Sequence, residues 1–248
     1  MLPENLRAAA AERLVANIKD YNYHLTTGFL GTPYLCHVLT RFGYHDVAYT
    51  LLMQETYPSW LYPVKMGATT IWERWDGQKP DSSFQTVGMN SFNHYAYGAI
   101  GDWMYRVVAG IDTDGESDGV GYKKIIIRPR IGGRILKAGE NASEWSKVGG
   151  LQKNSKDEGG LQTVAADLQT NYGKVSSHWK NENGQLSMEV EIPVNTSAVI
   201  YLPTGKTEII KEAGALISND KSIIIREKQT DYTILEVGSG KYFFTLQL

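Results

Sequence analysis

The spacing of apolar residues changes near Gly110, and this change restricts the possible folds more than any other feature of the sequence. Before Gly110, apolar residues recur at the three- and four-residue spacing of helices. After Gly110 they alternate with polar residues, as in strands that bury one face. The sequence therefore predicts a mixed, multidomain fold, with a helical part over residues 1–111 and a β part over residues 112–248.

Five helices are expected in the helical part, bounded by proline, glycine and capping residues. Their expected ranges are Glu4 to Ile18, Tyr34 to Phe42, Asp46 to Gln54, Ser59 to Lys65 and Phe92 to Ala109. The last range is apolar on nearly every side, which predicts a buried helix, and Ser91 is its expected cap.

Short strands separated by turn residues are expected in the β part. The dipeptide Asn183-Gly184 predicts a tight hairpin between the segments 175–179 and 186–192. Further candidate strands cover residues 124–127, 198–202, 222–226, 232–237 and 242–248. This pattern predicts an antiparallel β-sandwich. The polar, glycine-rich residues 149–160 are expected to form a mobile loop.

Charge and cysteine content exclude several classes of function. The 25 basic and 27 acidic side chains nearly balance, so we expect neither a nucleic-acid nor a membrane-surface partner. No apolar run is long enough to cross a membrane. Cys36 is the only cysteine, so no disulfide forms, and we expect it to be buried in a helix. No histidine spacing predicts a metal site, and no cofactor is expected. The first seven residues lack the pattern of a secretory signal, and the compartment stays open.

The clearest chemical signal lies in residues 67–77, Gly-Ala-Thr-Thr-Ile-Trp-Glu-Arg-Trp-Asp-Gly, where Glu73 lies between Trp72 and Trp75. Indole faces stack on the C–H faces of sugars, and a carboxylate among them can orient or deprotonate a water molecule. Such a cluster predicts a carbohydrate pocket. A structural explanation stays open, in which Glu73 and Arg74 form a surface ion pair and the tryptophans belong to the core.

Three further blocks accompany this motif in a fixed order. They are residues 25–34, Leu-Thr-Thr-Gly-Phe-Leu-Gly-Thr-Pro-Tyr, residues 51–62, Leu-Leu-Met-Gln-Glu-Thr-Tyr-Pro-Ser-Trp-Leu-Tyr, and residues 91–103, Ser-Phe-Asn-His-Tyr-Ala-Tyr-Gly-Ala-Ile-Gly-Asp-Trp. With these blocks the chain resembles the C-terminal part of the bacterial α-L-rhamnosidases of the inverting type. The resemblance runs from residue 26 through the strand at 125–129, and more loosely to residue 202.

This resemblance implies the C-terminal part of an (α/α)6 toroid followed by the β-sandwich. A toroid of this kind contains six helical pairs, so the five expected helices can form only its closing part. The sequence is therefore expected to be a fragment. The complete enzyme is expected to hydrolyse terminal α-L-rhamnosides with inversion, so that its partners are L-rhamnose-containing glycosides. Apolar helix faces that pack on the rest of a toroid are expected to let the fragment self-associate.

The resemblance implies roles for Glu73 and His94, and the side-chain types of Trp60, Trp75 and Asn93 make them further candidates. Glu73 is expected to be the general base, and His94 is expected to contact rhamnose hydroxyls. Trp60 and Trp75 are expected sugar platforms, although helical tryptophans commonly belong to the core. Asn93 either reaches the pocket or satisfies the start of a helix.

The proton donor is not expected among these residues, because the resemblance places it in an acidic block upstream. Asp76 and Asp81 are expected to be solvated loop residues. The fragment alone is therefore expected to have little or no turnover. Two other classes stay open, a carbohydrate-binding sandwich that holds sugar on Trp145 and Trp179, and a different (α/α)6 sugar hydrolase or phosphorylase.

Overall fold

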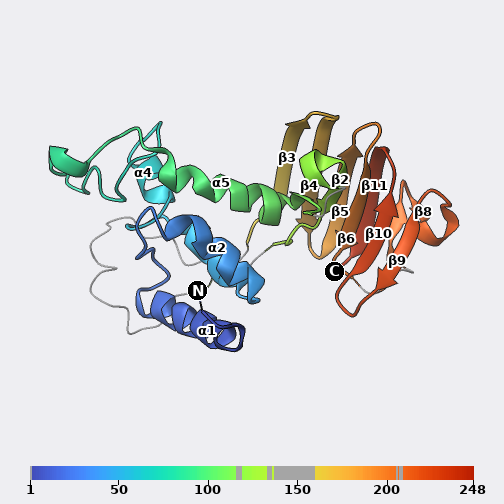
Figure 1. Cartoon of the computed structure of the whole chain (residues 1–248), viewed down its shortest axis with the longest axis horizontal. Helices are drawn as coiled ribbons and strands as arrows, with labels where there is room; N and C mark the ends of the chain where they lie inside the picture. The colour runs from blue at the N-terminus through green and yellow to red at the C-terminus, as the bar shows by residue number, and fades with distance from the viewer. Residues whose placement is uncertain (1, 116–118, 133–135, 137–159, 205, 207–208) are drawn as a thin grey trace. The chain divides into compact units, whose positions relative to one another are not determined.

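The structure is a computed structural model that describes residues 2–115, 119–132, 136, 160–204, 206 and 209–248. The chain divides into two compact units (Figure 1), and the first contains the residues up to Gly101. The second contains Asp102–Gly132 and Leu161–Leu248. The domain boundary between residues 111 and 112 stays a prediction. The expected mobile loop at 149–160 lies, except for Gly160, outside the described residues.

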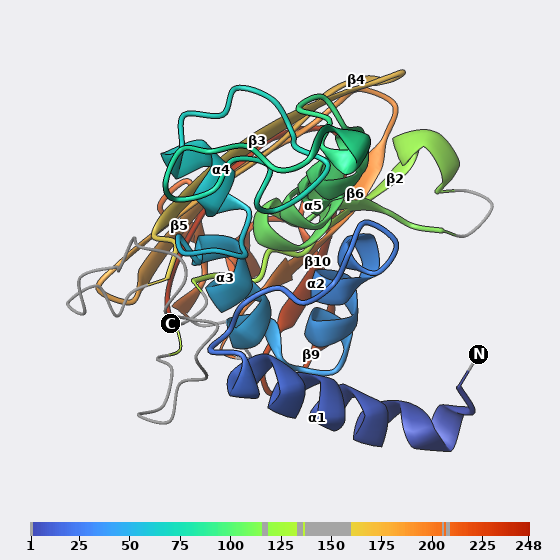
Figure 2. The ribbon, with the colours of Figure 1, turned by 90° about the vertical axis from the view of Figure 1, so that its left-hand side faces the viewer.

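The first unit contains four helices close to their expected positions, α1 (Glu4–Asp20), α2 (Thr32–Arg41), α3 (His45–Met53) and α4 (Leu61–Lys65). Helices α2 and α3 pack against each other (Figure 2). Cys36 is buried on α2, as expected, and burial raises the pKa of its thiol to about 12. Ser59 accepts a hydrogen bond from the Tyr62 amide at 3.1 Å, which supports the start of α4.

The expected fifth helix, from Phe92 to Ala109, is not a regular α-helix. It consists of the 3₁₀ helix η2 (Tyr95–Ala99), the α-helix α5 (Ile100–Trp103) and the π-helical η3 (Met104–Ala109). The expectation that it is buried on every side is wrong, because Tyr95 is 88% exposed although Trp103 is buried. Turns of different pitch do not hold apolar residues on one continuous stripe, and glycines in this run weaken an α-helix.

The second unit contains two sheets that form a sandwich (Figure 1). The first sheet has the order β1 (Ile111–Thr113), β2 (Lys124–Ile127), β6 (Ser197–Leu202), β10 (Thr233–Val237) and β9 (Ile224–Lys228). The second has the order β3 (Thr163–Thr170), β4 (Gly173–Glu182), β5 (Gln185–Ile192), β11 (Gly240–Gln247), β7 (Lys211–Glu212) and β8 (Ala215–Leu216). All described pairs are antiparallel except β2 with β6, which is parallel. The expected sandwich is present, but the parallel pair of β2 and β6 shows that it is not wholly antiparallel.

The predicted hairpin between β4 and β5 is confirmed. Asn183 and Gly184 adopt φ angles of 52° and 83°, as a tight turn of this kind requires. Leu186, Met188 and Val190 then alternate toward the core of the sandwich, where they are fully buried.

Strand β4 also holds the end of the irregular helix. The Trp179 indole N–H donates to the Val108 carbonyl at 2.8 Å, and the Ser177 hydroxyl donates to the Ala109 carbonyl at 2.6 Å. Trp179 is only 1% exposed, so it offers no surface on which a sugar could stack. This corrects the binding-module alternative as it applied to Trp179, whereas Trp145 lies outside the described residues.

Candidate functional site

Two short backbone segments of the first unit carry the predicted site residues side by side. The Glu73 amide donates to the Ser91 carbonyl at 2.9 Å, and the His94 amide donates to the Ile71 carbonyl at 2.9 Å. The rings of Trp72 and Phe92 meet edge to face between these two bonds, with centroids 5.2 Å apart. Glu73 and His94 therefore lie on adjacent segments, although a long loop separates them in the sequence.

The carboxylate of Glu73 is held by one oxygen. The Ser91 amide donates to its Oε2 at 2.8 Å, whereas Oε1 has no hydrogen-bond partner among the described residues. Arg74 does not pair with Glu73, because its Nε donates to Asp76 Oδ1 at 3.1 Å. The ion-pair explanation for Glu73 therefore does not describe the structure. A half-buried carboxylate with one fixed and one unpaired oxygen can accept a proton from water.

His94 caps the 3₁₀ helix η2 with its side chain, since its Nδ1 accepts a hydrogen bond from the Ala96 amide at 3.4 Å. The expected cap, Ser91, is therefore wrong, because the helical run begins at Tyr95 and its cap is His94. Because Nδ1 accepts, the neutral ring carries its proton on Nε2 and can donate it to a hydroxyl. The imidazole stacks on Tyr95 and contacts Phe29, with ring centroids 5.8 and 5.7 Å apart.

Trp60 and Trp75 are largely enclosed by protein, each being 9% exposed. The Trp60 indole donates to the Tyr97 carbonyl at 3.0 Å, and the Trp75 indole donates to the Thr27 carbonyl at 3.1 Å. Trp75 stacks on the Tyr97 ring at 3.6 Å and meets Trp60 edge to face at 5.6 Å. Asn93 is exposed, and its amide donates to the Ser91 hydroxyl at 3.1 Å.

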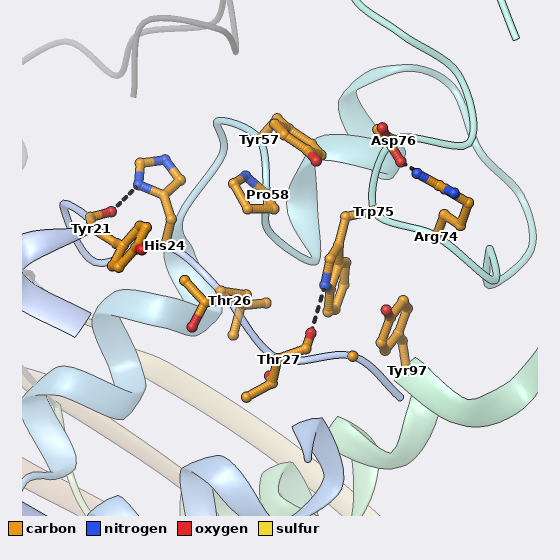
Figure 3. Close-up of a pocket in the computed structure, with 12 residues that line it drawn as sticks. Tyr21, His24, Thr26, Thr27, Tyr57, Pro58, Arg74, Trp75, Asp76 and Tyr97 are labelled. Atoms are coloured by element: carbon orange, nitrogen blue, oxygen red, sulfur yellow. Dashed lines mark hydrogen bonds and ion pairs between the residues drawn. The ribbon is translucent and has the colours of Figure 1, made fainter. Parts of the chain in front are cut away.

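A pocket of 420 Å³ opens beside Trp75 (Figure 3), and we call it the Trp75 pocket. Its lining residues are Tyr21, His24, Leu25, Thr26, Thr27, Gly28, Tyr57, Pro58, Arg74, Trp75, Asp76 and Tyr97. A smaller hollow of 40 Å³ lies against Trp60, Trp72 and Trp75. Glu73 and His94 line neither of these two hollows. The sequence did not single out Tyr57 or Tyr97 as site residues, because they come from separate segments that share no motif.

The two aspartates closest to Glu73 in the sequence are unsuited to donate a proton. Asp76 accepts from Arg74 through Oδ1 and from the Gln85 amide nitrogen through Oδ2. Asp81 accepts from both the hydroxyl and the amide of Ser83, and the hydroxyl is the main reason that its pKa lies below the usual value. Asp81 therefore stays ionised at neutral pH.

The described part of the chain does not meet the requirements of a metal-ligand cluster or of a membrane-spanning helix. Across residues 2–115 and the later described ranges, no three histidine, cysteine or acidic side chains gather as metal ligands. In the same residues no helix has both the length and the apolar character that crossing a bilayer requires.

Two family models match the sequence. Residues 1–108 match the bacterial alpha-L-rhamnosidase six-hairpin glycosidase domain, and residues 110–216 match the bacterial alpha-L-rhamnosidase C-terminal domain. The chain belongs to the bacterial α-L-rhamnosidase family. The family resemblance and the expected fold are thereby confirmed, with a six-hairpin glycosidase part followed by a sheet-rich rhamnosidase domain.

Known rhamnosidases match the chain over nearly its whole length. An alpha-L-rhamnosidase of Streptomyces avermitilis is 40% identical over 247 residues, which cover 99% of this chain and 20% of the relative. One of Formosa agariphila is 39% identical over 98% of this chain and 23% of the relative. The chain therefore spans about a fifth of the length of the curated rhamnosidases it matches.

Solved structures agree with these relatives. The crystal structure of the Streptomyces avermitilis alpha-L-rhamnosidase complexed with L-rhamnose matches with a TM-score of 0.78 and 39% identity, over 99% of this chain and 20% of that one. The alpha-L-rhamnosidase from Dictyoglumus thermophilum matches with a TM-score of 0.75 and 32% identity, over 100% of this chain and 24% of that one.

Proposed function

We propose that the protein containing this sequence hydrolyses terminal α-L-rhamnosides, and that this chain supplies the general base, Glu73. The hydrogen bonding of its carboxylate carries the proposal. Oε2 is fixed by the Ser91 amide, and Oε1 is unpaired among the described residues, so the group is oriented and can still accept a proton. The relative from Streptomyces avermitilis was crystallised with L-rhamnose, which supports a rhamnose-containing substrate.

In the proposed reaction, Glu73 takes a proton from a water molecule while the water oxygen attacks the anomeric carbon. The bond from that carbon to the aglycone oxygen breaks, and an acid protonates the leaving oxygen. Because water attacks from the face opposite the leaving group, the configuration inverts, and the two carboxyl groups lie about 6.5–9.5 Å apart. Asp76 and Asp81 are occupied or ionised, so the acid comes from a part of the enzyme beyond these residues.

His94 is proposed to hold the sugar by donating its Nε2 proton to a hydroxyl. Its ring is positioned for this by the Ala96 amide and by the faces of Tyr95 and Phe29. Asn93, exposed on the same segment, is proposed to add a second polar contact to the sugar.

Trp60 and Trp75 are proposed to form the wall behind these groups. Their low exposure and fixed indole N–H groups favour packing support over wide stacking on the rhamnose ring.

The base role is tested by Glu73→Gln in the full-length enzyme, with p-nitrophenyl α-L-rhamnoside as substrate. The glutamine carbonyl oxygen can still accept the Ser91 amide, so the local structure is kept while the base is lost. We expect kcat to fall by about 10²–10⁴-fold with little change in KM. Glu12→Gln, at an exposed position of α1, is the control and should behave as the wild type. Unchanged hydrolysis by Glu73→Gln would sink the proposal.

The purified 248-residue chain is expected to have little or no rhamnosidase activity, because no described residue near Glu73 is suited to act as the acid. General acid assistance alone is worth about 10²–10⁴-fold. Robust cleavage of the same substrate by this chain would contradict the assignment of the acid to another part of the enzyme.

A further inference from the structure

We propose that the Trp75 pocket is a second carbohydrate-binding site, whose ligand is an uncharged pyranose ring. It is separate from the Glu73–His94 site, since neither residue lines it. This proposal rests on the proposed function in one respect, namely that the enzyme acts on glycosides. The ring belongs either to the sugar unit attached to rhamnose or to a separate glycan, and both present the same chemistry to the pocket.

The size and floor of the pocket suit one sugar ring. Its volume of 420 Å³ lies in the range of about 300–1,000 Å³ that is usual for small-molecule sites. Trp75 is fixed in place because it donates to the Thr27 carbonyl at 3.1 Å and stacks on Tyr97 at 3.6 Å with an interplanar angle of 10°. Trp75 is only 9% exposed, so it contributes a small and rigid part of the lining, and a rigid group loses little conformational freedom when a ligand packs against it.

Polar groups converge on this surface. Figure 3 shows Tyr57 and Tyr97 on two sides of Trp75, with Arg74 and Asp76 close by. Neither tyrosine hydroxyl has a hydrogen-bond partner among the described residues. Burial is the main cause that raises the pKa of both tyrosines, so both hydroxyls keep their protons at neutral pH and can donate as well as accept.

The charges of the pocket favour an uncharged ligand. Arg74 donates its Nε to Asp76, and the two charges cancel within the lining. The terminal guanidinium nitrogens of Arg74 have no acceptor among the described residues. A hydroxyl can accept from Arg74 and donate to Asp76, whereas an anion would meet the carboxylate and a cation would meet the guanidinium.

The test measures binding of methyl β-D-glucopyranoside to the 248-residue chain by ligand-observed NMR and titration calorimetry. A ring of this size is expected to bind with a Kd on the order of 1 mM. Tyr57→Phe and Tyr97→Phe keep the rings and remove the hydroxyls, and each should weaken binding by about fivefold. Tyr34→Phe, at an exposed position outside the pocket, is the matched control and should bind as the wild type. Near-ultraviolet circular dichroism checks that the aromatic packing is kept.

Absence of saturable binding, or binding that neither Tyr57→Phe nor Tyr97→Phe weakens, overturns the proposal. Glu73→Gln should leave this binding unchanged, so a failure of the base role and a failure of the pocket are distinguishable. In the full-length enzyme, a higher KM of Tyr57→Phe for rhamnosyl-glucose, but not for p-nitrophenyl rhamnoside, assigns the ring to the neighbouring sugar of the substrate. A KM that Tyr57→Phe leaves unchanged for both substrates assigns it to a separate glycan.

Discussion

Replacing Gly77 by alanine is expected to disturb the Glu73 carboxylate without touching it. A Cβ atom at Gly77 would lie 2.9 Å from Asn90 Oδ1, 3.2 Å from the Trp72 ring and 3.3 Å from the Phe92 ring. Asn90 cannot swing away freely, because its Nδ2 donates to the Gly77 carbonyl at 3.0 Å. Overpacking of this kind costs about 1–3 kcal/mol. Since Ser91 follows Asn90 directly, a shift there moves the amide that holds Glu73.

Thermal unfolding and kinetics measure the two consequences. A cost of about 2 kcal/mol corresponds to a melting temperature lower by about 4–8 °C in a chain of this size. In the full-length enzyme, a displacement of the proposed base Glu73 approaching 1 Å should lower kcat by up to about 10²-fold. Gly88→Ala is the matched control in the same loop, because a Cβ there meets nothing within 4 Å. Equal melting temperatures and equal rates for the Gly77→Ala and Gly88→Ala variants would refute the reasoning.

Three further outcomes are expected. Gly184→Ala should lower the free energy of unfolding by about 1 kcal/mol, because φ is +83° there, whereas Gly238→Ala meets no atom within 4 Å and should be nearly neutral; denaturant melts that rank them equally would contradict this. Burial lowers the pKa of His24 in the folded chain. Below about pH 6.5 the unfolded chain therefore binds a proton at His24 more readily than the folded chain, which lowers the free energy of unfolding. The melting temperature should therefore fall on acidification from pH 7.5 to pH 5.5, and less so in His24→Gln; equal slopes would count against it. Light scattering should detect concentration-dependent self-association through apolar side chains such as Leu30, which is 80% exposed, and a monomer at every concentration would exclude it.

The elements that could be predicted from the sequence are those whose signals are local. Helices α1 to α4 follow from apolar spacing and from bounding glycine and proline residues, and the β4–β5 hairpin follows from Asn183-Gly184. Strand β3 was missed because its residues alternate only between exposed and half-buried positions, which leaves no strong apolar stripe. The parallel pairing of β2 with β6 joins segments far apart in the chain, and no local pattern records it.

The residues of the candidate site also divide into those with a local sequence signal and those without one. The Trp-Glu-Arg-Trp motif made Glu73 a candidate because its signal is the types of neighbouring side chains, which can be read from the sequence. Its partner is the backbone amide of Ser91, a group that every residue except proline has, so no residue type could reveal it. Tyr57 and Tyr97 come from separate segments and become pocket residues only when the chain folds.

The attachment of the Val108 and Ala109 carbonyls to β4 has a practical consequence for dissecting this protein. A piece excised at the apparent change of pattern, from Asp112 onward, would leave two buried donors, on Trp179 and Ser177, facing emptied space. Each such loss costs about 1–3 kcal/mol, so the excised piece would be less stable than the intact sandwich even without a ligand. A recombinant sandwich should therefore retain the residues from Asp102.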